Sequence, residues 1–398
     1  GLMAAIAAAE GGAQVCLIEP NERLGKKVNI TGKGRCNVTN DTDLEGLMAH
    51  IPCNSRFLYS ALSRFTSRDT MAFFEGCGVP LKVERGDRVF PVSDSAFDIT
   101  DALKRKAKAL HIRWAHDRAT AVETAEGHVT AVTGEKGIYP SDAVIIATGG
   151  VSYPGTGSTG DGYKIAAALG HTIVEPRGSL VPLVSDDDCC RHMQGLSLKN
   201  VELTAYNQKN KAVFQEFGEM LFTHFGVSGP LVLSASAHLR SWEKEQYRLS
   251  IDLKPALDEQ KLETRILRDI SESPNRDVEK LLCGLVPHSM APVISRRLGL
   301  PPTLKANSLT KEQRRALIRL LKHFDINVTD VRPVAEAIVT AGGVKVSEVK
   351  PNTMESKLVA GLYFAGEVLD VDAYTGGFNL QIAWATGHLA GVSAAERE

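Results

Sequence analysis

Glycines that lie between an apolar run and a helix pattern are the residues best placed for chemistry in this chain. Residues 143–148 have the pattern of a buried strand and lead into Gly149, while Gly160 and Asp161 open a helix pattern. Glycine adopts positive φ and lets the backbone pack closely against a flat ring or a phosphate. The pattern predicts a strand–turn–helix that holds a cofactor, with an ordinary glycine-rich turn as the alternative.

A segment near the C-terminus repeats this pattern. Residues 361–367 are typical of a strand that ends in Gly366 and Glu367, and Gly377 precedes a helix pattern that begins near Asn379. A helix N-terminus carries free N–H groups and positive partial charge. Directed at the N1–C2=O edge of a flavin, it would stabilise the anionic reduced ring. A simple capped helix is the alternative. The two segments described so far and a third at the start of the chain together favour a flavin cofactor.

The first residues fit the nucleotide end of such a site. Gly1 opens an Ala-rich helix pattern over residues 2–13. The apolar run 15–18, which Glu19 ends, predicts a buried parallel strand. In a Rossmann-type unit a glycine meets the pyrophosphate, and an acid about 20 residues on binds the ribose. Only the last glycine of G-x-G-x-x-G would be present here. An ordinary Ala-rich helix followed by a strand is the alternative for this fragment.

The elements around these segments indicate an α/β fold with an insert. We expect a helix over residues 97–110, strands between 112 and 132, and a closing helix over 378–395. From about residue 178 the texture changes to short alternating segments such as 201–205, which predict antiparallel strands. Residues 258–325 are charge-rich with helical periodicity, and the α/β texture returns near 331. One nucleotide-binding domain split by an insert is the simplest interpretation.

Composition excludes several classes of function. Of 398 residues, 43% are hydrophobic and 23% charged, and 46 basic against 47 acidic residues give a net charge of −1. This balance provides no electrostatic footprint for nucleic acid. We find neither a signal peptide nor an apolar run that could span a membrane. The seven cysteines form no C-x-x-C pair, and the acidic run 185–188 lacks calcium-site spacing, so we expect no metal and a cytoplasmic location.

Three motifs resemble those of a known family. They are residues 29–40 (Asn-Ile-Thr-Gly-Lys-Gly-Arg-Cys-Asn-Val-Thr-Asn), residues 154–162 (Pro-Gly-Thr-Gly-Ser-Thr-Gly-Asp-Gly) and the segment 365–387. The chain resembles the bacterial BaiN-type FAD-dependent oxidoreductases, which are also called bile-acid-reductase-like or aminoacetone-oxidase-like. The resemblance covers almost the whole chain, including residues 218–230 of the insert. The motif 159–162 is also similar to the fumarate-reductase flavoprotein group.

The resemblance implies a split Rossmann-like FAD-binding domain over 1–180 and 329–398. The insert would comprise an antiparallel β-barrel-like domain over 181–256 and a helical part over 257–328. Gly1 and Glu19 would serve the ADP half of FAD, and Val122 would offer its backbone to the adenine. The flavin and its ribityl chain would be held by Lys27, Thr31, Gly34, Arg35, Cys36, Gly366, Glu367, Gly377, Asn379 and Leu380. Family chains start with a strand and the full glycine fingerprint, so we expect residues that precede Gly1.

Catalysis would move a hydride through FAD, with NAD(P)H as a possible source, and would need a proton donor near the substrate. His224 is the first candidate, because it lies in a Gly-flanked motif of the insert, although a structural histidine fits equally well. Tyr374 as a phenol donor and Arg35 as an anion stabiliser are the alternatives. Cys36 could be a redox thiol if Arg35 lowered its pKa, but no resolving cysteine lies nearby.

Three functions remain open on the sequence alone. The first is an NAD(P)H-linked reductase of a small substrate such as an unsaturated ketone. The second is an oxidase, for example of amines, that passes electrons to oxygen. The third is a flavin-binding sensor without turnover, which an insert that covers the flavin disfavours. The neutral charge disfavours an RNA-modifying enzyme. The sequence specifies neither the substrate nor the oligomeric state, and it contains no separate NAD(P)H fingerprint.

Overall fold

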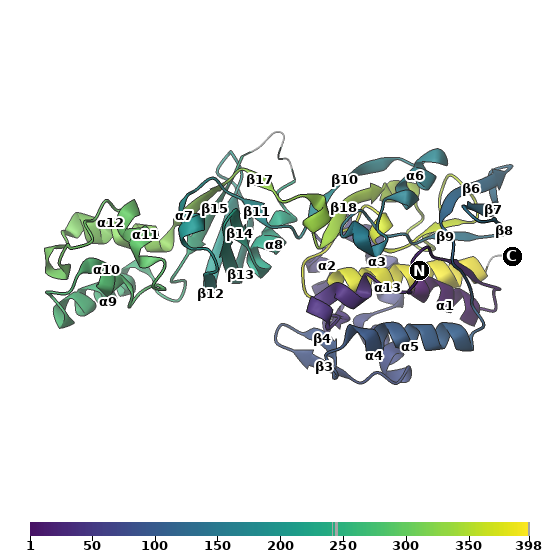
Figure 1. Cartoon of the computed structure of the whole chain (residues 1–398), viewed down its shortest axis with the longest axis horizontal. Helices are drawn as coiled ribbons and strands as arrows, with labels where there is room; N and C mark the ends of the chain where they lie inside the picture. Colours follow the sequence, from purple (N-terminus) through teal and green to yellow (C-terminus); the bar gives the residue numbers. More distant parts are fainter. Residues whose placement is uncertain (241, 243–245, 397–398) are drawn as a thin grey trace. The chain divides into compact units, whose positions relative to one another are not determined.

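The chain divides into two compact units in a computed structural model that describes residues 1–240, 242 and 246–396 (Figure 1). Unit 1 comprises Gly1–Ser179 and Pro333–Glu398, and unit 2 comprises Leu180–Arg332. Unit 1 is thus built from two stretches of chain that are separated by the whole of unit 2. The sequence analysis placed the corresponding boundaries after residues 180 and 328.

Parallel strand pairs position the glycine-rich turns of unit 1. β9 (Val144–Ile146) pairs with β19 (Leu362–Phe364), with Val144 opposite Leu362. β1 (Cys16–Ile18) pairs with β5 (Arg113–Ala115), also in parallel. Helices between parallel strands make this an α/β domain, as predicted. The expectation that β1 is buried was wrong, because Cys16 is exposed and the other two residues are only half-buried.

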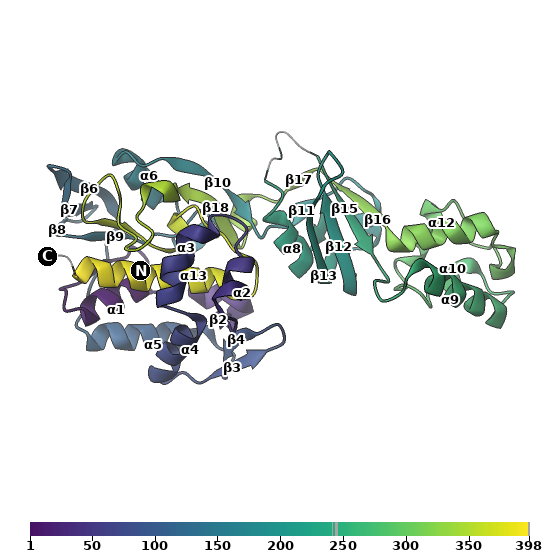
Figure 2. The ribbon, with the colours of Figure 1, turned by 180° about the vertical axis from the view of Figure 1, so that it is seen from behind.

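A close contact between two helices joins the ends of the chain within unit 1. α1 (Leu2–Glu10) packs against α13 (Phe378–Ala395), and both views show the two helices side by side (Figure 2). A Cβ atom on Gly391 would lie 2.3 Å from the carbonyl oxygen of Ala4. The small residues of both helices therefore allow their backbones to touch.

The remaining elements of unit 1 surround this arrangement. The predicted helix 97–110 is α5 (Ala96–Ala109), and the helix after the second glycine turn is α6 (Asp161–Ala168). The other helices and strands are α2 (Leu44–Ala49), α3 (Ser55–Arg64), α4 (Ser67–Gly76), β2 (Thr39–Asn40), β3 (Leu81–Glu84), β4 (Arg88–Pro91), β6 (Ala119–Ala125), β7 (His128–Gly134), β8 (Ile138–Pro140), β10 (Ile173–Ser179) and β18 (Val339–Val344).

Unit 2 contains an antiparallel sheet in the order β16-β15-β12-β13-β14-β11-β17 among the described residues. The edge strands β16 (Phe324–Val328) and β17 (Asp330–Val331) are separated by Thr329 alone. One chain segment therefore serves both edges, which requires a rolled sheet. No ladder pairs β16 with β17 in the part of the chain described, so hydrogen bonds do not close a barrel. The other elements are β11 (Leu183–Val184), β12 (Ser197–Tyr206), β13 (Ala212–Thr223), β14 (Gly226–Ser228), β15 (Tyr247–Asp252), α7 (Cys189–His192) and α8 (Pro230–Ser236).

The charge-rich stretch of unit 2 is helical, as its periodicity predicts. It forms α9 (Glu259–Glu272), α10 (Val278–Leu282), α11 (Ala291–Arg297) and α12 (Lys311–Lys322). α12 starts at a capping box in which Thr310 accepts from the Gln313 N–H and Gln313 accepts from the Thr310 N–H. None of the helices in the described ranges combines the length and apolar character needed to cross a membrane.

Candidate functional site

Two glycines with positive φ follow the neighbouring parallel strands β9 and β19. Gly149 and Gly366 both have φ +74°. A Cβ atom on Gly149 would lie 3.1 Å from Ser158 Oγ and 3.8 Å from Glu367 Oε2. The carboxyl ends of adjacent parallel strands are where α/β domains bind ligands. The structure thus brings together three of the predicted residues, from segments more than two hundred positions apart.

An ion pair between Lys27 and Glu367 anchors this edge of the sheet. Lys27 Nζ lies 2.6 Å from Glu367 Oε2 and donates to Ser152 Oγ at 2.8 Å. Ser152 Oγ in turn donates to Glu367 Oε1 at 3.0 Å, and the Thr340 N–H donates to the same oxygen at 2.7 Å. The carboxylate is therefore held by three donors while both charged side chains stay partly exposed, at 24% and 19%.

Sequence reasoning identified the two charged members of this cluster and missed the other two. Ser152 follows the predicted glycine turn by two residues, so its place in that loop was the available signal. Thr340 contributes a backbone N–H from β18. A backbone donor is independent of residue type, so no sequence pattern marks it.

The predicted nucleotide end lies beside the loop that contains the second glycine motif. Glu19 accepts hydrogen bonds from the Asn21 N–H at 2.9 Å and from Asn21 Nδ2 at 2.8 Å. Asn21 Nδ2 also donates to the Thr156 carbonyl at 3.1 Å. Gly157 has φ +103°, and a Cβ atom there would lie 2.4 Å from Asn21 Nδ2. Glu19, the end of β1 and the glycine loop are therefore linked through Asn21, which sequence reasoning missed.

Gly160 and Asp161 start α6, as predicted, and Asp161 has protein partners. Gly160 caps the helix with φ +79°. Asp161 accepts from Arg118 Nε and from Thr159 Oγ1, both at 2.8 Å. Burial opposes ionisation, but these hydrogen bonds lower the pKa of Asp161 below its ordinary value. Asp161 therefore fixes the start of α6 to the segment before β6, where Val122 is buried.

The first part of the motif 29–40 forms a tight turn with the preceding residues, in which Thr31 Oγ1 donates to the Val28 carbonyl at 2.7 Å. Gly34 has φ +86°, and Cys36 has φ +59° although it is not glycine. Left-handed backbone of this kind brings main-chain N–H groups to one side of a turn and suits a phosphate or ring. The structure leaves the role of Thr31 and Gly34 in FAD binding as a prediction.

Arg35 is neutralised by carboxylates of its own chain. Its Nη2 lies 2.5 Å from both Glu84 Oε1 and Asp94 Oδ1, and its guanidinium lies 4.1 Å from the centroid of the Phe90 ring. The hydrogen bonds to Glu84 and Asp94 raise the pKa of Arg35. To stabilise an enolate, Arg35 would have to exchange these partners for the substrate.

Cys36 does not have the chemistry of a redox thiol. Its side chain is fully buried, and burial raises its pKa to about 12 although Thr31 hydrogen-bonds to it. The expectation that Arg35 lowers the pKa of Cys36 was therefore wrong, because burial of the thiol dominates its pKa. A thiol with so high a pKa stays protonated and unreactive at neutral pH.

The N-terminus of α13 is shaped by Gly377 and Asn379. Gly377 has φ +99°, and a Cβ atom there would lie 2.4 Å from the Thr39 carbonyl oxygen. Asn379 Oδ1 accepts from the Ala373 N–H at 2.9 Å, and its Nδ2 donates to the Tyr374 carbonyl at 3.2 Å. Asn379 therefore holds the loop that carries Tyr374, and Leu380 is half-buried in the same turn. The first N–H groups of α13 have no partners within the helix, as at any helix start.

His224 belongs to unit 2, in the turn between β13 and β14. Its ring is exposed and lies edge-on to Phe225, with centroids 5.1 Å apart. Tyr374 belongs to unit 1, where its N–H donates to the His50 carbonyl at 3.0 Å. The two proton-donor candidates thus lie in different units, and the role of each stays a prediction.

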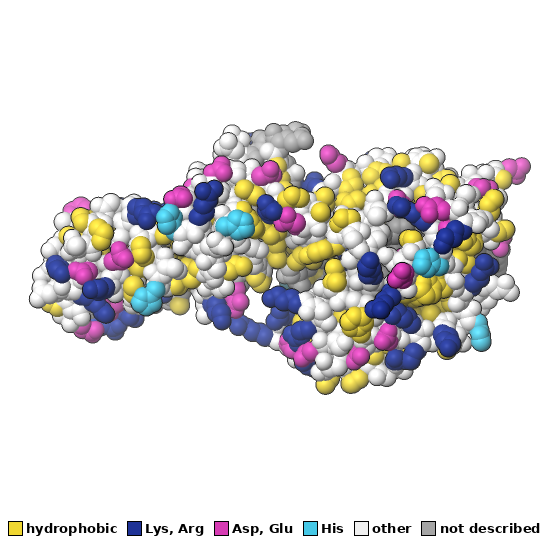
Figure 3. All heavy atoms as spheres, in the orientation of Figure 1, with side chains coloured by type: hydrophobic (Ala, Val, Ile, Leu, Met, Phe, Trp, Pro, Cys, Tyr) yellow, Lys and Arg dark blue, Asp and Glu magenta, His cyan; other side chains and the backbone are white. Residues whose placement is uncertain are grey.

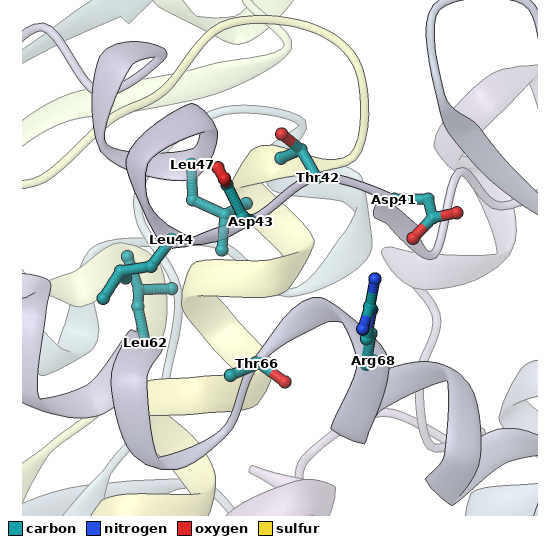
Figure 4. Close-up of a pocket in the computed structure, with 8 residues that line it drawn as sticks. All are labelled: Asp41, Thr42, Asp43, Leu44, Leu47, Leu62, Thr66 and Arg68. Carbon is teal, nitrogen blue, oxygen red and sulfur yellow. The ribbon is translucent and has the colours of Figure 1, made fainter.

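A pocket of about 320 Å³ in unit 1 contains none of the predicted site residues (Figure 4). Three leucine side chains and Asp43 lie on one side, and Asp41 and Arg68 lie at the other. Asp41, which lines the pocket, directly follows β2, and Thr39 of β2 lies against Gly377. The residues that line it are Asp41, Thr42, Asp43, Leu44, Leu47, Leu62, Thr66 and Arg68.

A family model described as the HI0933-like protein Rossmann domain matches residues 1–393. The chain belongs to the HI0933-like family. It is 32% identical over 405 residues to the 3-dehydro-bile acid delta(4,6)-reductase of Clostridium scindens, covering 100% of this chain and 97% of that protein. It is 32% identical over 390 residues to the ribosomal RNA dihydrouridine synthase of Escherichia coli, covering 97% and 93%. The synthase of the same name from Haemophilus influenzae is 30% identical and is covered to 95%.

Solved structures support the fold of this HI0933-like chain. The 3-ketosteroid-delta4-(5alpha)-dehydrogenase of Rhodococcus jostii RHA1 aligns with a TM-score of 0.53 at 15% identity, over 100% of this chain and 95% of that one. Escherichia coli quinol fumarate reductase FrdA aligns with a TM-score of 0.50 at 17% identity, over 99% and 68%. The predicted kinship with the bile-acid-reductase-like oxidoreductases is confirmed, and the chain is an enzyme of an FAD-dependent oxidoreductase family.

Proposed function

We propose that unit 1 binds FAD along the carboxyl ends of β9 and β19 and that the enzyme reduces a C=C bond conjugated to a carbonyl group. The observation that carries the proposal is the convergence of Gly149, Gly366 and the Lys27–Glu367 pair at that edge. Both glycines have positive φ, and a Cβ atom on Gly149 would lie 3.1 Å from Ser158 Oγ, so glycine keeps the backbone of this edge close-packed and accessible to a ring or ribityl chain. Lys27, Thr31, Gly34, Cys36, Gly149, Gly160, Gly366, Glu367, Gly377, Asn379 and Leu380 would hold it, with Gly1, Glu19, Val122 and Asp161 around its ADP half.

When bound, FAD supplies two-electron chemistry at its N5 atom. The residues of this chain supply position and charge. The N-terminus of α13 offers N–H groups and positive partial charge, which stabilise an anionic ring edge. Lys27 fixes the Glu367 carboxylate, which would accept hydrogen bonds from the hydroxyl groups of the ribityl chain. Tyr374 or His224 would deliver a proton to the substrate.

The names of the relatives support a conjugated C=C bond as the group that is reduced. A delta(4,6)-reductase of a 3-dehydro-bile acid acts on double bonds conjugated to a ketone, and a dihydrouridine synthase acts on the C=C bond of a uracil ring, which is conjugated to a carbonyl. When a simple enone is reduced in this way, the hydride adds to its β-carbon and the proton to its α-carbon. We propose NAD(P)H as the reductant, so that one NAD(P)⁺ forms for each C=C bond that is reduced.

Anaerobic turnover tests this proposal. The full-length protein loaded with FAD is mixed with NADH or NADPH and an α,β-unsaturated ketone, and nucleotide oxidation and saturated product are measured. We expect one of the two nucleotides to be oxidised, in an amount equal to the saturated product that forms. Peroxide formed in air, with an amine as the electron donor and no use of NAD(P)H, would favour the oxidase instead.

A further inference from the structure

Positive charge is concentrated in the helical part of unit 2. Residues 254–322 contain fourteen Lys and Arg against eight Asp and Glu, in a chain whose net charge is −1. Charges act over about 10 Å at 0.1 M salt, so a partner responds to the local surface and not to the total. The neutral balance of the whole chain therefore does not exclude an anionic partner for this part.

α12 carries a regularly spaced share of this charge that is not paired with acids. Lys311, Arg315 and Arg319 repeat every four residues, so they form one ridge along the helix with steps of about 6 Å. All three are exposed, and none makes an ion pair with any residue that the structure describes. His323, four residues further on, is also exposed. We call Lys311, Arg315 and Arg319 the basic ridge.

α9, in the same helical part, differs from α12 because its basic side chains are paired with neighbouring acids. Arg265 pairs with Asp269 at 2.8 Å, Arg268 with Glu272 at 3.7 Å, and Lys261 with Asp258 at 3.3 Å. Figure 3 shows basic and acidic side chains intermingled over the region where Figure 1 places α9 and α10. α9 is therefore neutralised by its own acids. α12 has a single acid, Glu312, which makes no ion pair within the described ranges, although a hydrogen bond from its own backbone N–H and, to a smaller degree, the nearby charges of Arg315 and Lys311 lower the pKa of its carboxyl group. One acid against three ridge cations leaves the ridge with a positive excess.

The side chains around the ridge restrict the kind of anion. No Phe, Trp or Tyr occurs between 254 and 322, so this part lacks the aromatic platforms on which single-strand binders stack successive bases. The apolar face of α12, with Leu317, Ile318 and Leu321, is buried and cannot enter a membrane. With base stacking and membrane insertion set aside, the ridge is suited to contact regularly spaced phosphates, as on the backbone of a folded nucleic acid.

We propose that the basic ridge of α12 docks the phosphate backbone of a folded RNA that carries the base to be reduced. The choice of RNA rests on the proposed function, because the uracil ring of RNA contains a C=C bond conjugated to a carbonyl group. Two relatives are named for that reaction on ribosomal RNA, and this chain covers more than 90% of the length of each. Docking at the ridge itself depends only on charge and exposure.

Binding of a fluorescein-labelled RNA stem-loop to the full chain tests the proposal. We expect Arg315→Glu with Arg319→Glu to weaken binding by about tenfold or more and to flatten the dependence of log Kd on log salt, since each lost phosphate contact removes nearly one unit of slope. The matched control is Lys261→Glu with Arg268→Glu, which makes the same charge change on α9. We expect this control to bind within about threefold of wild type.

The proposal is overturned if both double variants bind like wild type, if both lose affinity equally, or if anionic phospholipid vesicles bind the ridge while the stem-loop does not. Thermal unfolding of each variant shows whether it is folded. Reduction of a small unsaturated ketone is measured on the same preparations, and the ridge variants should retain it. Loss of that activity in every preparation, with RNA binding intact, would contradict the proposed reduction and leave the docking surface standing.

Discussion

At the scale of single residues, the Lys27–Glu367 pair is the contact that distinguishes a cofactor site from a glycine-rich turn. Its carboxylate is fixed by three donors, yet both side chains keep exposed surface from which a ligand can be reached. A pair needed only for stability gains little when it is partly exposed. We therefore interpret it as an anchor prepared for a polyol or a ring edge.

We expect Lys27→Met to weaken FAD binding about fivefold, or about 1 kcal/mol, because Glu367 loses its charged partner and turns from the ligand. Lys26→Met is the matched control, since Lys26 is the exposed neighbour in the same loop. Quenching of FAD fluorescence during titration measures both dissociation constants. Equal constants for the two variants would remove Lys27 from the site.

At the scale of elements, the N-termini of α6 and α13 determine the positions of the glycine-rich turns that precede them. The N-terminus of α6 is fixed by Asp161, whose pKa is lowered by Thr159 and Arg118. A carboxyl group with a lowered pKa contributes stability above its unfolded pKa, near 3.8, and loses it as the pH falls through the folded value. The acid range is therefore where this contact can be observed.

Asp161→Asn should destabilise the protein by about 1 kcal/mol at pH 7, and the difference from wild type should shrink below about pH 4. Urea unfolding at several pH values measures it. Asp101→Asn is the control, because Asp101 makes only an exposed pair with Lys104 at 3.1 Å. A difference between wild type and Asp161→Asn that grows as the pH falls would contradict the assignment.

The contact between α1 and α13 permits a second test at this scale. Gly391→Ala would place a methyl group 2.3 Å from the Ala4 carbonyl oxygen, so we expect a loss of about 2 kcal/mol in the free energy of unfolding. Gly76→Ala, in α4, meets open space and should be neutral or slightly stabilising. Thermal unfolding of both variants decides the matter, and equal melting temperatures would show that the helices do not touch as described.

At the scale of the whole molecule, sequence reasoning succeeded where a pattern is local. The apolar runs that end in Gly149 and Gly366 predicted β9, β19 and the turns after them, and the helix starts at Asp161 and Phe378 followed from the same glycines. Helical periodicity predicted α9 to α12.

What could not be predicted depends on partners far apart in the chain. Arg35 meets Glu84 and Asp94, and Glu367 meets Thr340, through the packing of separate segments. The order of the sheet in unit 2 arises from such long-range pairing too. The charge total concealed the basic ridge, because it averages a basic helical part with an acidic remainder.

The most direct test of the central claim is a titration of the full-length protein with FAD, followed by absorbance near 450 nm and by flavin fluorescence. We predict saturable binding of one FAD per chain, with a structured flavin band that bleaches when NADH or NADPH is added without oxygen. A folded protein that shows no saturable FAD binding would contradict the assignment of the glycine-lined edge of β9 and β19 as a flavin site.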